Sequence, residues 1–147
     1  MKKRSEILTL SRLKEVIHYD METGVFTMLP GAGRGQLLRP KPAGTVKNQS
    51  GYRRIQIDGV IYGGNQLAWF YVTGEWPDRQ IDHRNRDTSD DRFYNLRLAT
   101  QTQNKANSGA YKNNGLGIKG VRLHRNGQFE ARLRIHAPLR HTPLWRL

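Results

Sequence analysis

Residues 81–107 read IDHRNRDTSDDRFYNLRLATQTQNKAN, and the spacing of four polar residues sets this stretch apart. The pair Asp82-His83 is followed by Asn95, twelve residues after the histidine, and by Asn104, nine residues after that. A carboxylate, an imidazole and two amides at such intervals indicate a site that is assembled from separate elements rather than from one loop.

The hydrophobic pattern around these residues predicts a strand–strand–helix unit. Residues 81–84, IDHR, indicate a short strand whose alternation places Asp82 and His83 on opposite faces. Residues 95–99, NLRLA, alternate as a second strand, and the polar segment 84–92 must turn the chain between them. Thr100 and Gln103 are typical of a capping box, which predicts a helix that carries Asn104. The unit would bring all four polar side chains into one cleft.

This stretch resembles the HNH endonucleases, in the branch that includes homing endonucleases common in bacteriophage genomes. The matching words are IDH, DDR.YNLR.AT and QN..N. Three upstream segments resemble the same family: LTLSRLKEVIHYDMETGVFT, GYRRIQIDG and LAWFYVTGEWP. The resemblance extends from about residue 9 to about residue 135. It implies an α+β fold with a ββα-metal nuclease core, preceded by a β-hairpin and a helix.

The resemblance also implies a role for each of the four polar residues. His83 matches a general base that takes a proton from water, and Asn95 matches the residue that orients the histidine ring. Asp82 and Asn104 match two ligands of a single divalent cation. Magnesium keeps several waters, so that one carboxylate and one amide carbonyl suffice, and Mn²⁺ can substitute for it. The implied reaction is hydrolysis of a DNA phosphodiester, leaving 5′-phosphate and 3′-hydroxyl ends.

Other polar residues near the motif receive more ordinary expectations. We expect Asp87, Asp90 and Asp91 to make turn hydrogen bonds or to pair with Arg92. Four arginines are candidates for phosphate contacts, although each is equally consistent with a plain surface charge: Arg84, Arg86, Arg92 and Arg97. Family members usually carry a histidine where this chain has Asn65, and we therefore leave Asn65 out of the catalytic set.

Composition favours a nucleic-acid partner. The 147 residues include 25 Lys and Arg against 12 Asp and Glu, a formal net charge of +13. Such a balance indicates a polyanion, nucleic acid before anything else. The resemblance to HNH endonucleases implies that this is double-stranded DNA, and we expect neither a membrane nor a small-molecule cofactor as a partner. The chain has no cysteine, which excludes disulfides and a zinc site built on cysteines. With no long apolar run and no signal peptide, it is expected in the cytoplasm, that of the host if it is phage-encoded. The oligomeric state is left open.

We divide the chain into three parts. Residues 1–50 predict a helix over 10–17, a strand over 25–28 and a basic Gly- and Pro-rich loop from residue 30 to residue 51. Residues 51–108 predict the nuclease core, with a hairpin at Asp58-Gly59 and a helix over 65–72 ended by Gly74. Arg54 and Gln56 would face away from the core and could reach phosphate.

Residues 109–147 form a basic appendage with eight Lys or Arg and one acid, Glu130. A turn at Asn126-Gly127 between alternating segments predicts a β-hairpin. It resembles a truncated ethylene-response-factor-type DNA-binding module, which implies DNA contacts by Arg122, Arg132 and Arg134. The third strand and helix of that module have no counterpart in the sequence.

Two other functions remain open. The departure at Asn65 and the short appendage are also consistent with a DNA-binding protein whose nuclease core is degenerate and inactive. An RNA-binding or ribosome-associated protein is less consistent, because the aromatic residues lie in apolar patterns rather than on a stacking platform.

Overall fold

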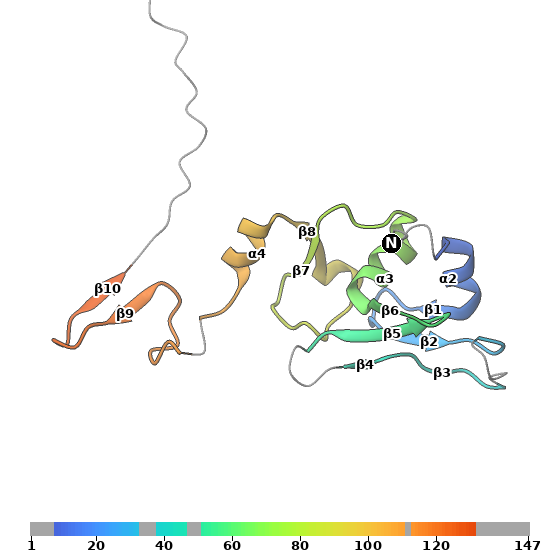
Figure 1. Ribbon diagram of the computed structural model, residues 1–147, viewed down its shortest axis with the longest axis horizontal. Coiled ribbons are helices and arrows are strands. Elements are labelled where there is room, and N and C mark those ends of the chain that lie inside the picture. The colour runs from blue at the N-terminus through green and yellow to red at the C-terminus, as the bar shows by residue number, and fades with distance from the viewer. Residues whose placement is uncertain (1–7, 33–37, 47–50, 111–112, 132–147) are drawn as a thin grey trace, which may run out of the picture. The chain divides into compact units, whose positions relative to one another are not determined.

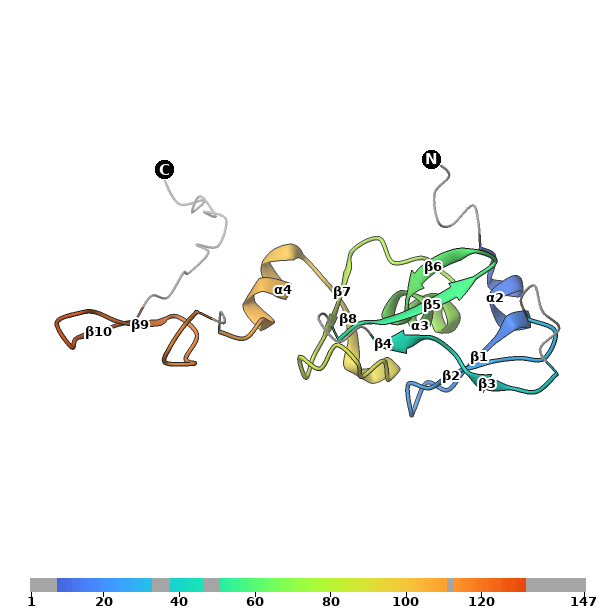
Figure 2. The ribbon, with the colours of Figure 1, turned by 60° about the horizontal axis from the view of Figure 1, so that its bottom comes forward.

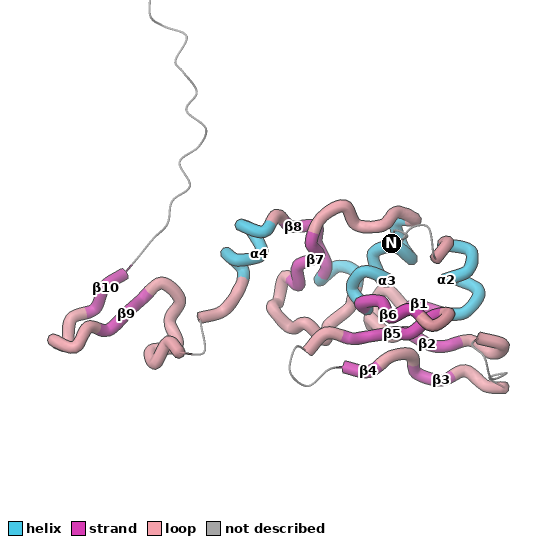
Figure 3. Tube along the Cα trace, viewed as in Figure 1, coloured by secondary structure: helices cyan, strands magenta, loops and turns pink. Residues whose placement is uncertain are grey.

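A computed structural model describes residues 8–32, 38–46, 51–110 and 113–131. The chain forms two units, Met1–Ser108 and Gly109–Leu147. Within the described residues, the first unit is a mixed α/β structure of three helices and several small antiparallel sheets (Figures 1 and 3). Its elements are α2 (Leu10–Val16), β1 (Ile17–Tyr19), β2 (Phe26–Met28), β3 (Lys41–Pro42), β4 (Thr45–Val46), β5 (Arg53–Ile57), β6 (Val60–Gly63), α3 (Gly64–Thr73), β7 (Gln80–His83), a 3-10 turn η1 (Phe93–Asn95), β8 (Leu96–Ala99) and α4 (Gln101–Asn107).

Helix α2 is capped by Thr9, whose side chain accepts a hydrogen bond from the backbone N–H of Arg12 at 3.2 Å. The expected helix over 10–17 is one residue too long, because Ile17 already pairs with Met28 in the sheet β1–β2–β3. The expected loop from residue 30 to residue 51 was also too simple, since its described part contains the two short strands β3 and β4.

The hairpin β5–β6 confirms the turn predicted at Asp58-Gly59. Both turn residues have positive φ, 49° and 85°, as a type I′ turn requires. Along β5, Ile55 and Ile57 are buried whereas Arg54 and Gln56 are exposed, as the alternation predicts. Strand β4 pairs with β5 on its other edge, so segments on both sides of residue 50 share one sheet.

Helix α3 lies over β5 and β6, and α2 packs beside it (Figure 1). It ends at Gly74, whose left-handed φ of 77° confirms the predicted stop. The apolar core joins all of these elements: Leu13, Val16, Ile17, Tyr19, Phe26, Ile55, Ile57, Tyr62, Leu67, Ala68 and Phe70. Ile81 of β7 and Leu96 of β8 belong to the same core, which anchors the predicted site to the rest of the unit.

In the second unit, β9 (Val121–Leu123) and β10 (Phe129–Ala131) form the predicted hairpin, with the turn at Asn126-Gly127. Its apolar residues are not buried: Phe129 is 69% exposed and Leu123 is 48% exposed. The resemblance to an ethylene-response-factor-type module is not confirmed. Arg122 lies on β9 opposite Glu130, whereas Arg132 and Arg134 lie outside the described residues. No helix in the described ranges is long and apolar enough to cross a membrane.

Candidate active site

Strands β7 and β8 and helix α4 form the predicted strand–strand–helix unit (Figure 2). The antiparallel register places Asp82 opposite Arg97 and His83 opposite Leu96. Both hydrogen bonds of the capping box at the start of α4 are present: the Thr100 side chain accepts from the Gln103 N–H, and the Gln103 side chain accepts from the Thr100 N–H. The capping box sets the start of α4 directly after β8, and the helix contacts both strands.

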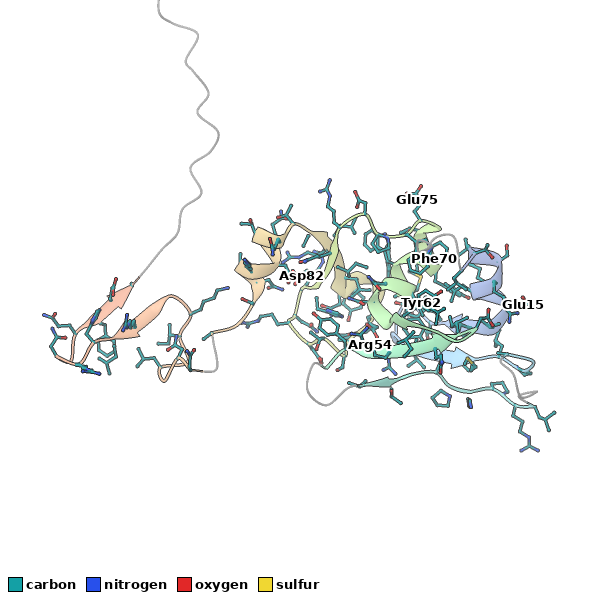
Figure 4. All side chains as sticks on the ribbon, viewed as in Figure 1. Glu15, Arg54, Tyr62, Phe70, Glu75 and Asp82 are labelled. Atoms are coloured by element: carbon teal, nitrogen blue, oxygen red, sulfur yellow. The ribbon has the colours of Figure 1, made fainter. Side chains whose placement is uncertain are left out.

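Asp82 is the centre of a polar cluster on one face of β7, where Figure 4 labels it. Its side chain is buried, and its oxygen Oδ2 accepts hydrogen bonds from Arg97 Nε at 2.9 Å and Nη2 at 2.6 Å. Asn107 Nδ2 lies 3.0 Å from Asp82 Oδ1, 3.1 Å from Oδ2 and 2.7 Å from the His83 carbonyl oxygen. Three oxygens therefore converge on one amide nitrogen.

The structure brings Asn107, rather than Asn104, to Asp82. Asn104 Nδ2 donates instead to Gln80 Oε1 at 2.9 Å, one alternation earlier on the same face of β7. Residues three apart share a helix face, and residues two apart share a strand face. Asn104 therefore pairs with Gln80, and Asn107 pairs with Asp82. Sequence reasoning missed Asn107, although it is the last letter of the matching word QN..N.

His83 projects from the other face of β7, as the alternation predicted. Its side chain is 2% exposed, and its ring lies 5.7 Å from the ring of Tyr52, between centroids. A carboxylate also faces the ring: Asp91 Oδ1 lies 3.6 Å from His83 Nε2. The backbone of His83, rather than its ring, contacts the Asp82 cluster: the His83 carbonyl oxygen accepts a hydrogen bond from Asn107.

Asn95 holds the loop between the two strands. Its Nδ2 donates to Asn85 Oδ1 at 3.0 Å and to the Asp90 carbonyl at 2.9 Å, and its Oδ1 accepts from the Asn85 N–H at 3.1 Å. Its backbone carbonyl accepts from the Arg84 N–H, the residue directly after His83. Asn95 thus constrains the chain next to the histidine, and none of these hydrogen bonds reaches the imidazole itself.

Two of the three loop aspartates behave as expected. Asp87 accepts from the backbone and the hydroxyl of Ser89, and these hydrogen bonds lower its pKa. Asp90 accepts from Arg92, and this interaction lowers the pKa of Asp90 to about 2. The expectation for Asp91 was wrong: its side chain is buried and pairs with Arg53 of β5 at 3.2 Å. The sequence held no signal for this, because Asp90 and Asp91 are adjacent and chemically identical.

The four candidate phosphate-binding arginines fall into two groups. Arg84 and Arg86 are exposed, whereas Arg92 and Arg97 are paired with Asp90 and Asp82. Arg54, labelled in Figure 4, lines two neighbouring surface hollows. The first, of about 320 Å³, is also lined by Tyr52, Asn65 and Asn104, among others. The second, of about 480 Å³, adds Thr45, Gln56 and Ile61. Among the described lining residues of both hollows, Arg54 carries the one charge.

The oxygens around Asn107 fit a hard divalent cation. Two carboxylate oxygens and a backbone carbonyl are the ligand types that Mg²⁺ prefers. A cation there would require Arg97 to release Asp82 Oδ2 and the Asn107 amide to turn its own oxygen inward. In the described part of the chain no three His, Cys, Asp or Glu side chains gather around a metal position. A bound ion would therefore keep several waters, as Mg²⁺ does.

A comparison with known protein families gives a match to the segment that contains Asp82 and His83. Residues 65–106 match the family model described as HNH endonuclease, which confirms the resemblance seen in the sequence. The matched segment runs from Asn65 in α3 through β7 and β8 into α4, and ends one residue before Asn107. No curated protein and no solved structure gives a match to the chain. The match indicates a nuclease or DNA-binding function in general.

Proposed function

The chain carries an HNH endonuclease segment over residues 65–106, and from this premise we propose that it is a metal-dependent endonuclease that cuts double-stranded DNA. The observation that carries the proposal is the cluster on β7, β8 and α4. It brings Asp82 and Asn107 together although they lie 25 residues apart in the sequence, and it joins them to the backbone of His83.

The proposed roles follow from the chemistry of each side chain. Asp82 and Asn107 would hold the cation, with the His83 carbonyl as a third oxygen and Asn104, one helical turn away, as the alternative amide. A divalent cation there supplies charge stabilisation for the phosphate and for the leaving 3′ oxygen. His83 would accept a proton from the attacking water, since a neutral imidazole nitrogen can do so near neutral pH. Hydrolysis in this sense leaves a 5′-phosphate and a 3′-hydroxyl.

The charge of the chain supports DNA as the substrate. A net charge of +13 favours binding to the phosphate backbone. Arg54 supplies a positive charge to two hollows, the first of which is also lined by Asn104. In the second unit, Arg122 is exposed on the hairpin, and we propose it as a further phosphate contact. The same proposal extends to Arg132 and Arg134 from their sequence pattern.

A plasmid nicking assay tests the function. We expect Mg²⁺-dependent or Mn²⁺-dependent nicking of supercoiled DNA that EDTA abolishes, with ligatable 5′-phosphate ends. His83→Ala should abolish nicking and leave DNA binding intact. His18→Ala is the matched control, because His18 is exposed on β1 and should tolerate the change. Nicking by His83→Ala at the rate of the unchanged protein would contradict the proposed role.

Two observations favour a second candidate, a DNA-binding protein with an inactive core. Arg97 already neutralises Asp82, and the ring of His83 is buried. Under this alternative, Mg²⁺, Mn²⁺ and Ni²⁺ would all fail to support nicking, while DNA binding would still weaken steeply with salt. The assay therefore separates the two candidates without a known target sequence.

A further inference from the structure

Asp91 is a buried carboxylate in a loop whose adjacent residues, Asp90 and Arg92, are only half-buried. Its side chain is 1% exposed, compared with 10% for Asp90 beside it. Arg53 Nε on β5 donates to Asp91 Oδ2 at 3.2 Å, and the Tyr19 hydroxyl on β1 donates to the Asp91 backbone carbonyl at 2.6 Å. Two strands that lie far from this loop in sequence therefore hold Asp91 in place.

Two glycines leave room for Asp91, Gly64 beside its carboxylate and Gly24 beside its backbone. A Cβ on Gly64, at the start of α3, would lie 2.6 Å from Asp91 Oδ2, a distance at which the two atoms cannot coexist. A Cβ on Gly24, where φ is +72°, would lie 2.8 Å from the Asp91 backbone carbon. A buried acid that three elements and the turn at Gly24 accommodate is costly to maintain, which indicates a use for it.

The free oxygen of this carboxylate faces His83. Asp91 Oδ1 lies 3.6 Å from His83 Nε2, and within the described residues neither this oxygen nor either ring nitrogen of His83 has a hydrogen-bond partner. A buried polar atom without a partner destabilises the folded state, because it has lost its hydrogen bonds to water. A small rotation of the ring or of the carboxylate would form an N–H···O bond and satisfy two of these atoms at once.

We propose that Asp91 is a positioning residue for His83, accepting a hydrogen bond from one ring nitrogen and so fixing the tautomer and the ring orientation. The ring nitrogen that faces the carboxylate carries the proton, and the other nitrogen is left as an acceptor. This inference rests on the proposed function, in which that second nitrogen takes the proton of the attacking water. Arg53 acts one step further out, because it fixes the carboxylate rather than the ring.

The test compares Asp91→Asn with Asp90→Asn, the same chemical change one residue earlier in the loop. Long-range ¹⁵N–¹H spectra at about pH 8.5, where an ordinary histidine is neutral, report the tautomer of His83. We expect a single tautomer in the unchanged protein and in Asp90→Asn, and a mixture or the opposite tautomer in Asp91→Asn. In the nicking assay, Asp91→Asn should lower kcat on the order of 100-fold with KM little changed.

A second variant separates positioning from folding. Arg53→Met removes the ion pair but leaves Asp91 facing the ring, so that it should lower the melting temperature while His83 keeps its tautomer. An unchanged tautomer in Asp91→Asn would overturn the proposal, even if that variant were less stable. Because the spectra need no DNA and no activity, a fixed tautomer in a protein that never nicks would count against the endonuclease function and not against the role of Asp91.

Discussion

Arg97 holds Asp82 through two nitrogens that both donate to the same carboxylate oxygen, Oδ2, at 2.9 and 2.6 Å. The guanidinium therefore supplies positive charge at the carboxylate that the proposed cation would use. A charge-assisted pair of this kind is stronger than a neutral hydrogen bond, although partial exposure of Arg97 weakens it.

The first prediction follows from that competition. Arg97→Ala should bind Mn²⁺ several-fold more tightly than the unchanged protein, equivalent to about 1 kcal/mol. The reason is that Mn²⁺ no longer has to displace the Arg97 guanidinium from Asp82. Electron paramagnetic resonance of free Mn²⁺ during titration measures the affinity. Arg12→Ala is the control, since Arg12 also donates to a carboxylate through Nε and Nη2, one to each oxygen of Asp58, in another part of the unit. Equal affinities of Arg97→Ala and the unchanged protein would refute the competition.

The second prediction distinguishes the two asparagines of α4. Asn107→Ala should weaken Mn²⁺ binding on the order of tenfold, about 1.4 kcal/mol, because its amide lies against Asp82 and the His83 carbonyl. Asn104→Ala should leave the affinity nearly unchanged, because its amide is bonded to Gln80. Isothermal titration calorimetry measures both. The opposite ranking would restore Asn104 as the metal ligand that the family pattern implies.

The third prediction concerns the loop that Asn95 holds. Asn95→Ala removes three side-chain hydrogen bonds at a buried position and should lower the free energy of unfolding by about 2–4 kcal/mol. Amide hydrogen exchange should accelerate at Asn85, whose N–H would lose its acceptor. Asn126→Ala, in the exposed hairpin turn of the second unit, provides a comparison that should leave this loop unaffected. An unchanged rate of amide hydrogen exchange at Asn85 would argue against the proposal that Asn95 holds this loop.

The fourth prediction tests the two hollows that Arg54 lines. Arg54→Ala should weaken DNA binding and reduce the slope of log affinity against log salt by about 0.9, the contribution of one phosphate contact. Lys14→Ala removes the same charge from α2, where the ammonium lies over the Tyr71 ring, and should change the slope little. Fluorescence anisotropy at several salt concentrations gives both values. If the two variants have the same slope, Arg54 contributes only general charge.

The fifth prediction concerns alkaline stability. Burial of Tyr19, followed by the nearby charge of Asp91, raises the pKa of its hydroxyl above the ordinary value near 10. Because the folded state holds this proton more tightly than the unfolded state, its contribution to stability is complete below pH 10 and is lost as the pH rises further. Tyr19→Phe should start about 1 kcal/mol less stable, having lost the bond to Asp91, but decline less between about pH 10 and 12. Chemical denaturation at each pH measures the difference, and parallel declines would contradict it.

Much of the local structure could be predicted because its causes lie within a few residues. The positive φ values at Asp58 and Gly59, the capping box of Thr100 and Gln103, and the alternation along β5 each depend on neighbours in the sequence. The short sequence motifs around Asp82 and His83 are local in the same sense, and they were sufficient to predict the HNH endonuclease family. Errors at this level were small, such as the end of α2, where Ile17 left the helix to pair with Met28.

Apart from the short strands β3 and β4, the sequence by itself determined which elements form and which face of β7 each polar side chain occupies, since backbone conformation and alternation are local properties. The tertiary structure alone decided the partners: Asn107 rather than Asn104 for Asp82, Arg53 rather than Arg92 for Asp91, and Asp91 as the acid beside His83. Such choices depend on how far a helix slides along a strand and on which of two adjacent aspartates turns inward. A shift of one helical turn or one residue changes each partner, and packing against the core, rather than any local pattern, sets that shift.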